Sequence, residues 1–386
     1  MAIRDCALRD PSFAKLLDVY NNRDRAAAAY RKEGGRVLAK LGFDVPDELV
    51  LAAGLMPVQV YADPDKELVY TNKMLEFAFD PMVRKQFEKL VDGTYKSQAD
   101  FLAVSNSTDV IIRVFLYLRE ILRSLPEMQV PPTCFIDWLF TRNRMHQERN
   151  ELTIRLFIKQ LEDWTGNKIT DEQIKKAAKL CNENRAALRK IGALRHGEEV
   201  RISGTEALVI IGAGFFMDKK EHTALVEELA KSAADWPVIT GPRVFITGSV
   251  HEDLAVYSMI EDAGAVIVSE DHDWGDRSYD RDFNLDYSAV RGTVDRYMLR
   301  SFSSKKAFVS QRVQALNDAV KANGAQAVIF YTNIYEEAAS WDYPSQKKSL
   351  DEQGIKNASW VKMQYPAKLN EGLAESIADF VKGLEA

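Results

Sequence analysis

The sequence predicts an α/β fold in which two doubly wound, mostly parallel-sheet lobes are joined by a helical module. Short apolar segments alternate with helical ones over residues 36–145, long amphipathic helices follow, and a second alternation begins near residue 241. Alternation of strand and helix is typical of parallel sheets, because parallel strands need a crossover connection that is usually a helix. We therefore expect an N-terminal helical arm at 1–35, a first lobe at 36–145, the helical module at 146–240 and a second lobe at 241–386.

The first elements are predicted from local signals. An alanine run at 26–29 lies among charged residues and is followed by Gly34 and Gly35, which indicates helices that end there. Strands are expected at 37–41, 57–61, 101–104 and 133–136, where apolar residues cluster. Pro46 and Gly54 bound one helix between these strands, and an apolar helix is expected from Asp109 to about Leu125.

The remaining elements follow the same reasoning. Two long helices are expected from His146 to about Leu194, and Thr170 with Gln173 forms a capping-box signature at the start of the second. Strands of the second lobe are expected at 244–247, 265–268, 327–331 and 360–363.

Composition limits the classes of function. The 386 residues carry a net charge of -6, with scattered basic residues, so neither nucleic acid nor an anionic membrane is an expected partner. We find no apolar stretch of about 20 residues and no secretory signal, and expect a cytoplasmic protein. Cys6, Cys134 and Cys181 lie far apart, which disfavours a disulfide framework or a self-contained cysteine metal site.

Common catalytic and nucleotide-binding motifs do not occur in the sequence. The glycines at 212 and 214 begin like a dinucleotide fingerprint, but the third glycine is missing. A Walker A sequence and a Gly-x-Ser-x-Gly elbow are also absent, so we expect that this chain does not hydrolyse ATP itself.

Polar segments follow the predicted strands at 105–109, 248–251, 269–277 and 332–342. Open parallel sheets bind ligands beyond the carboxyl ends of their strands, so these segments are the candidate site. Residues 269–279 combine four acids with His272 and Arg277. His272 would titrate near neutral pH, and Arg277 would clamp a phosphate or carboxylate. The alternatives are a solvated surface loop with a local Arg–Asp pair, or a metal site formed by Asp271, His272 and Asp273.

Six segments together resemble the large subunits of the 2-hydroxyacyl-CoA dehydratase and benzoyl-CoA reductase family. They occur in the family's order at 45–58, 107–109, 214–226, 260–268, 327–330 and 341–348. The resemblance implies a complex in which an activator hydrolyses ATP and delivers a low-potential electron to a [4Fe–4S] cluster. In the family three cysteines from three separate loops hold that cluster.

This chain departs from the family at all three cysteine positions, which fall within 42–46, at Thr108 and near Tyr335–Glu336. Hydroxyl and carboxylate groups do not replace the soft thiolates that hold such clusters. The resemblance therefore implies that the cluster is on a homologous partner subunit, and that this chain contains no ligand set for it. An ATP-hydrolysing activator and an acyl-CoA substrate are the other implied partners.

The expected function is that of a cluster-free subunit in a benzoyl-CoA reductase-like complex, inactive in isolation. The alternatives are a subunit of a 2-hydroxyacyl-CoA dehydratase and a non-catalytic binding or scaffold protein. We expect Asp271, His272, Arg277 and Glu336 to converge on one pocket, because the strands before them share a sheet. The candidate catalytic residues are His272, Asp271, Arg277 and Glu48, and the candidate substrate-binding residues are Thr108, Asp109, Asn333, Tyr335 and Glu336.

Overall fold

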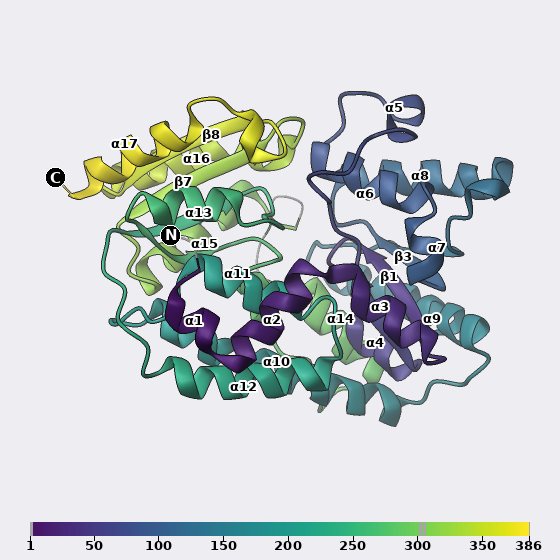
Figure 1. The fold of residues 1–386 in the computed structure, drawn as a ribbon. Helices are drawn as coiled ribbons and strands as arrows, with labels where there is room; N and C mark the ends of the chain where they lie inside the picture. The colour runs from purple at the N-terminus through teal and green to yellow at the C-terminus, as the bar shows by residue number, and fades with distance from the viewer. Residues whose placement is uncertain (1–2, 301–302, 304–305, 386) are drawn as a thin grey trace.

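The computed structural model describes residues 3–300, 303 and 306–385. It contains two four-stranded sheets, in the orders β2-β1-β3-β4 and β6-β5-β7-β8, and every strand pair within them is parallel. The two lobes built on these sheets lie side by side (Figure 1). The predicted α/β class with two parallel-sheet lobes is thus confirmed.

The first sheet consists of β1 (Arg36–Leu41), β2 (Leu55–Gln59), β3 (Phe101–Ser105) and β4 (Thr133–Ile136). Alternate side chains along a strand point to opposite faces. Val37 and Ala39 accordingly pack in a core with α6 (Pro81–Val91), α7 (Thr94–Gln98) and α8 (Asp109–Ser124). Leu38 packs on the other face, with α4 (Asp47–Ala52) and α9 (Arg144–Thr165). A short helix, α5 (Thr71–Met74), precedes α6.

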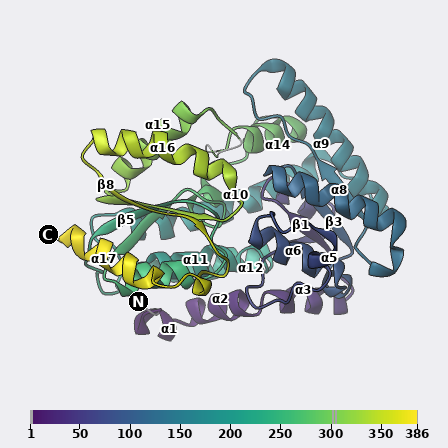
Figure 2. The same ribbon diagram turned by 90° about the horizontal axis from the view of Figure 1, so that it is seen from above.

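The second sheet consists of β5 (Arg243–Gly248), β6 (Val266–Glu270), β7 (Ala327–Asn333) and β8 (Lys356–Met363). One face packs against α11 (Gly204–Ala213), α13 (Ala255–Asp262) and α17 (Leu373–Glu385). The other face carries α15 (Val309–Ala322) and α16 (Glu337–Glu352), where Phe245 and Phe330 contact Leu316 and Leu350. Figure 2 shows these two helix layers on opposite sides of the sheet.

Helices outside the sheets connect the lobes. The long helix α10 (Asp171–His196) begins with the predicted capping box at Thr170 and contacts α4 in the first lobe and β6 in the second. It also packs on α12 (Lys219–Ala233), whereas α14 (Ala289–Met298) packs against α9. The arm consists of α1 (Asp5–Arg9), α2 (Pro11–Asn21) and α3 (Arg23–Lys32), and it reaches both lobes, because α2 lies on α11 and α3 on β1.

Arg23, at the start of α3, joins the arm to both lobes. Its guanidinium lies over four aromatic rings, at 4.3 Å from Tyr20, 4.8 Å from Tyr61, 5.6 Å from Phe216 and 4.9 Å from Trp274. A desolvated cation over aromatic faces is held by the ring quadrupoles. These rings come from the arm, the first lobe, the loop after α11 and the loop after β6, so this contact fixes how the lobes meet.

Strand ends differ from the sequence prediction where strands lie at an edge or carry polar residues. The edge strand β8 begins at Lys356 rather than 360. The sequence prediction missed this start because the first residues of the strand form no apolar run. The strand β7 continues to Asn333 for a related reason, since Thr332 and Asn333 are polar although buried. None of the described helices is long and apolar enough to span a membrane.

Candidate functional site

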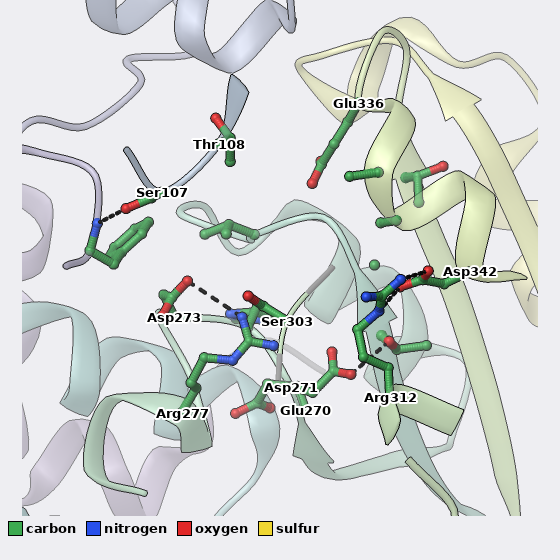
Figure 3. A pocket seen from close by; sticks show the side chains of 18 of the residues that line it. Ser107, Thr108, Glu270, Asp271, Asp273, Arg277, Ser303, Arg312, Glu336 and Asp342 are labelled. Atoms are coloured by element: carbon green, nitrogen blue, oxygen red, sulfur yellow. Dashed lines mark hydrogen bonds and ion pairs between the residues drawn. The ribbon is translucent and has the colours of Figure 1, made fainter. Parts of the chain in front are cut away.

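A cavity of about 880 Å³ lies where the carboxyl ends of the two sheets face each other (Figure 3). The first lobe contributes residues that follow β1 and β3, including Phe43, Asp44 and Thr108. The second lobe contributes the segments that follow β5, β6 and β7. The cavity therefore occupies the place where parallel sheets bind ligands.

The structure brings most of the sequence-predicted residues to this cavity. The lining includes Asp271, His272, Arg277, Glu336, Thr108, Asp109 and Tyr335. Asn333 lies outside it as the buried end of β7, where its backbone N–H donates to Ser249 Oγ at 2.8 Å.

Glu48, selected from the sequence as a candidate catalytic residue, also lies outside the cavity. It is fully buried on α4, where Oε1 accepts from Arg185 Nη2 at 2.8 Å and Oε2 accepts from the Tyr297 hydroxyl at 2.9 Å. Both carboxylate oxygens are occupied in the core between α4, α10 and α14. Glu48 thus holds helices together.

The segment 269–279 is mostly buried, so its interpretation as a solvated surface loop is wrong. The expected Arg–Asp pair exists, with Arg277 Nη1 at 3.4 Å from Asp273 Oδ2, and Arg300 Nη2 donates to Asp273 Oδ1 at 2.6 Å. Burial opposes the charge of Asp273, but Arg300 and Arg277 together hold the pKa of that carboxyl well below its usual range. Asp273 is therefore a fixed anion between two cations.

The metal-site alternative finds no support in the geometry. Across residues 3–300, 303 and 306–385, no group of three or more His, Cys, Asp or Glu side chains is arranged to hold a metal ion. Asp271 Oδ2 instead accepts from Thr247 Oγ1 at 2.9 Å, and burial raises the pKa of Asp271.

His272 does not titrate near neutral pH, contrary to the sequence-based expectation. Burial lowers its pKa to about 4, against the opposing effect of Glu270. Nε2 lies 2.8 Å from the Tyr257 hydroxyl, and Nδ1 has no hydrogen-bond partner among the described residues. His272 is therefore a neutral imidazole at physiological pH.

In three cavity acids the pKa is raised towards neutral pH. Burial raises the pKa of Glu252 to about 7, and burial with repulsion from Asp80 raises that of Glu336 to about 7. Burial likewise raises the pKa of Asp80 to about 6. They come from three loops, since Asp80 caps α6, Glu252 follows β5 and Glu336 precedes α16. Of these three acids, sequence reasoning selected only Glu336, and it did so as a substrate-binding residue.

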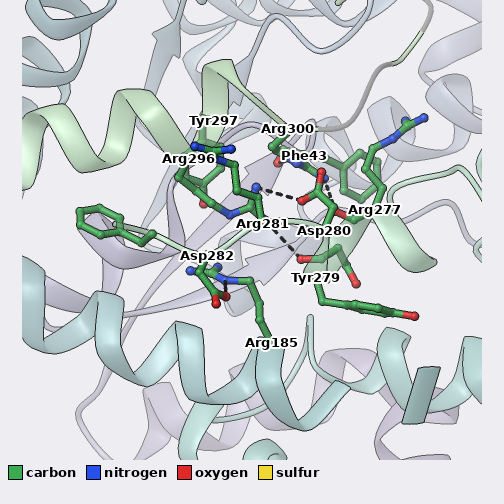
Figure 4. Close-up of polar contacts among 12 residues, drawn as sticks. Phe43, Arg185, Arg277, Tyr279, Asp280, Arg281, Asp282, Arg296, Tyr297 and Arg300 are labelled. Atoms are coloured by element: carbon green, nitrogen blue, oxygen red, sulfur yellow. Dashed lines mark hydrogen bonds and ion pairs between the residues drawn. The ribbon is translucent and has the colours of Figure 1, made fainter. Parts of the chain in front are cut away.

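Cations line or border the cavity as well. Arg312 Nε donates to Asp342 Oδ2 at 2.6 Å beside the second sheet, and Lys306 pairs with Asp44 from the first lobe. Arg300 Nη1 also donates to Asp44 Oδ1 at 3.2 Å. Ion pairs thus cross from one lobe to the other. Figure 4 shows Arg277 and Arg300 together with Arg185, Arg281 and Arg296 around Asp280 and Asp282.

Local sequence signals mark only some of these additional residues. Asp80 precedes Pro81 at a helix start, and Glu252 directly follows the predicted strand-end segment 248–251. The pairing of Asp44 with Lys306 joins positions 262 residues apart. A pair at that separation leaves no local pattern.

The residues at the family's cysteine positions do not fit a [4Fe–4S] cluster. Asp44 is paired with cations, Thr108 Oγ1 accepts from the Ile111 backbone N–H at 3.3 Å, and Glu336 accepts from Ser249 Oγ. All three offer oxygen, whereas such clusters need thiolates.

The three cysteines do not supply the missing thiolates. Cys6, Cys134 and Cys181 lie on α1, β4 and α10, away from the lining residues of the cavity. Burial raises the pKa of Cys134 above its usual range and that of Cys181 to about 12, which keeps these two thiols protonated.

Comparisons with known proteins define the class. The family described as "2-hydroxyglutaryl-CoA dehydratase, D-component" matches residues 43–361. The chain is 24% identical to the (R)-phenyllactyl-CoA dehydratase beta subunit of Clostridium sporogenes, covering 90% of this chain and 91% of the relative. It is also 24% identical to the beta subunit of (R)-2-hydroxyglutaryl-CoA dehydratase from Acidaminococcus fermentans, covering 84% and 86%. One of the benzoyl-CoA reductase subunits of Thauera aromatica is 22% identical, with the same two coverages.

The fold, the inter-lobe cavity and these matches define a subunit of the acyl-CoA dehydratase and reductase class. Because the match extends over most of the chain, this protein belongs to the 2-hydroxyglutaryl-CoA dehydratase D-component family.

Proposed function

We propose that this chain is the cluster-free subunit of an ATP-activated acyl-CoA dehydratase or reductase complex. The observation that carries the proposal is a cavity at the facing sheet ends that has a charged lining but offers oxygen groups where the family has cysteines. Such a subunit needs a homologous partner that holds the [4Fe–4S] cluster and an activator that hydrolyses ATP.

The lining residues suit binding and proton holding. Arg277 and Arg312 place guanidinium groups at the cavity wall, where a guanidinium can hold a phosphate or polarise a thioester carbonyl. Glu252 and Glu336 titrate close to neutral pH, because burial raises the pKa of each to about 7, so each can hold or release a proton there. A protonated acid in a water-poor cavity can donate to a developing anion.

Two reactions are compatible with this site. Reductive dearomatisation of an aryl-CoA is the first, because the sequence of residues 270–277 looks more similar to the benzoyl-CoA reductase branch of the family than to its dehydratases. Dehydration of a 2-hydroxyacyl-CoA is the second candidate, and it is favoured by the names of two of the three relatives described above, which are dehydratase subunits. A scaffold role would use the same fold without contributing groups to the reaction.

The test is reconstitution of a complex. This chain is co-expressed anaerobically with a cysteine-bearing homologue and an activator ATPase, and the product formed from phenyllactyl-CoA or benzoyl-CoA is analysed. We expect co-purification and ATP-dependent turnover, which should fall at least tenfold in Arg277→Met and stay unchanged in Arg9→Met, a variant of an exposed arginine on α1. Equal turnover with Arg277→Met would instead support the scaffold role, and failure of the two folded chains to associate would contradict the proposal.

A further inference from the structure

The cavity extends into the second lobe along one face of α15. The residues that this helix and its C-terminal end contribute to the lining recur every three or four positions, namely Arg312, Ala315, Leu316, Ala319 and Asn323. Residues with this spacing share one face of a helix, and at about 1.5 Å of rise per residue they span roughly 16 Å. The cavity therefore has an arm beneath α15, and Figure 3 shows Arg312 and Asp342 at its inner end.

The second sheet forms the opposite wall of the arm. Its lining residues are alternate ones, which point to the same face of a strand, namely Phe245 and Thr247 of β5 and Phe330 and Thr332 of β7. Helix α16 adds Gln346, which is 5% exposed, and its side-chain amide has no hydrogen-bond partner among the described residues. A buried amide without a protein partner is normally satisfied by water. The arm is therefore suited to hold ordered water.

The outer end of the arm lies beside the surface of the second lobe. Asn323 and His196, the last residue of α10, line this end. Arg243 joins them, because its Nη2 donates to the backbone oxygen of His196 at 2.8 Å and to that of Asn323 at 2.7 Å. The neighbours of Asn323, Ala322 and Gly324, are exposed, and the His196 side chain is 25% exposed. The arm thus connects the cavity with solvent at a second place, apart from the first-lobe wall.

Asp276 orients the imidazole of His196. Nε2 of His196 is buried and lies 3.0 Å from Asp276 Oδ2. Burial opposes the charge of Asp276, but contacts with His196, Arg195 and Ser269 hold the pKa of that carboxyl well below its usual range. An ionised carboxylate can only accept, so Nε2 carries a proton and Nδ1 of the neutral ring keeps its lone pair. Nδ1 is not enclosed and has no partner among the described residues, so it can take up a proton.

We propose that the arm is a solvent channel and that His196, positioned by Asp276, exchanges protons between solvent and the cavity at its outer end. Its use in turnover rests on the proposed function, because dehydration releases a proton together with hydroxide and reductive dearomatisation consumes protons. Nδ1 of His196 takes a proton from water outside and passes it to water in the arm, which returns the ring to its neutral form. For a reaction that releases a proton, the same steps run in reverse.

The channel is tested on the full chain alone by cysteine labelling. Leu316→Cys and Val320→Cys form a matched pair, because both positions lie on α15 and are 2% and 1% exposed, but only Leu316 lines the arm. The folded variants are treated with a small cationic methanethiosulfonate, and peptide mass spectrometry follows each labelled site. We expect Leu316→Cys to react about tenfold faster or more, because the reagent arrives through water in the arm. Equal rates at the two positions would overturn the channel.

The role of His196 is tested in the assembled complex. His196→Gln should lower turnover about tenfold or more, and added imidazole should restore part of it, which it would not do for a purely structural loss. His146→Gln is the control, because this histidine on α9 does not line the cavity, and it should leave turnover unchanged. Unchanged turnover in His196→Gln, or a loss that imidazole does not restore, would overturn the proton-exchange role. Absence of turnover with the unaltered chain would instead contradict the proposed function.

Discussion

Replacing Glu252 by glutamine should change how the stability of the chain depends on pH. Glu252 is 1% exposed, its Oε2 accepts from the Ala62 backbone N–H at 2.6 Å, and its Oε1 accepts from Gln86 Nε2 at 3.0 Å. Burial raises its pKa to about 7, against 4.5 for an ordinary glutamate. The folded chain therefore binds this proton more tightly than the unfolded chain does.

The sign of the effect follows from linkage. Because the folded pKa is raised, the contribution of Glu252 is greatest below pH 4.5, falls as the pH rises towards 7 and is constant above that. At 1.36 kcal/mol per pH unit, a shift from 4.5 to about 7 costs roughly 2.5 kcal/mol between pH 5 and pH 8. A glutamine side chain cannot ionise, so Glu252→Gln should avoid this loss and still accept from the Ala62 N–H.

The assay is urea unfolding at pH 5, 6, 7 and 8, followed by tryptophan fluorescence. We expect the free energy of unfolding of Glu252→Gln, relative to the unaltered chain, to rise by roughly 2.5 kcal/mol from pH 5 to pH 8. Glu375→Gln, at an exposed position on α17, should follow the unaltered chain within about 0.5 kcal/mol. A constant difference between Glu252→Gln and the unaltered chain across this range would refute the reasoning.

Three further predictions concern the lobes and the cavity. Arg23→Ala should lower the free energy of unfolding by about 2 kcal/mol or more, because the variant loses the buried cation that contacts four aromatic rings. Arg25→Ala, at an exposed arginine, should change the free energy of unfolding by less than about 0.5 kcal/mol, and thermal denaturation compares the two variants. His272→Ala should reduce turnover of the assembled complex at least tenfold and, because the ring is buried, also lower the melting temperature; normal steady-state rates in the folded variant would argue against a role in the cavity. The chain should co-elute with a cysteine-bearing homologue in gel filtration at micromolar concentration, and separate elution of two folded chains would count against pairing.

The fold was largely predictable because its signals are local. Buried parallel strands are short apolar runs, and the helix starts at Thr170 and Asp109 carry capping residues with apolar spacing behind them. The prediction missed both ends of β2, which spans Leu55–Gln59 rather than 57–61. It also missed ends of β6, β7 and β8, where polar residues continue a strand whose hydrogen bonds come from its neighbour. Hydrogen bonds between backbones decide where those strands end, and the types of the side chains do not indicate these bonds.

The candidate site was predictable in position but not in chemistry. Parallel sheets bind ligands beyond the carboxyl ends of their strands, and this rule located Thr108, Asp271, His272 and Glu336, because it depends only on where strands end. Glu48 was chosen from the segment that resembles the family and not by this rule, and its carboxylate packs against Arg185 outside the cavity. The sequence did not predict the protonation state of His272 either, since its low pKa arises from burial that only tertiary packing produces.

The same limit applies to the inter-lobe contacts. Asp44 meets Arg300 across 256 positions, and the Arg23 cage draws rings from Tyr20 to Trp274. Each residue alone is an ordinary charged or aromatic side chain in the sequence. Their joint effect depends on how the two lobes approach each other.

The central claim is that this subunit holds no cluster of its own and works beside one that does. The most direct test is anaerobic reconstitution of the purified chain with iron and sulfide, followed by desalting, iron and sulfide analysis and the visible absorption spectrum. We expect no bound cluster on this chain, while a cysteine-bearing homologue treated in parallel takes up about four irons. About four irons and four sulfides on this chain alone would contradict the account.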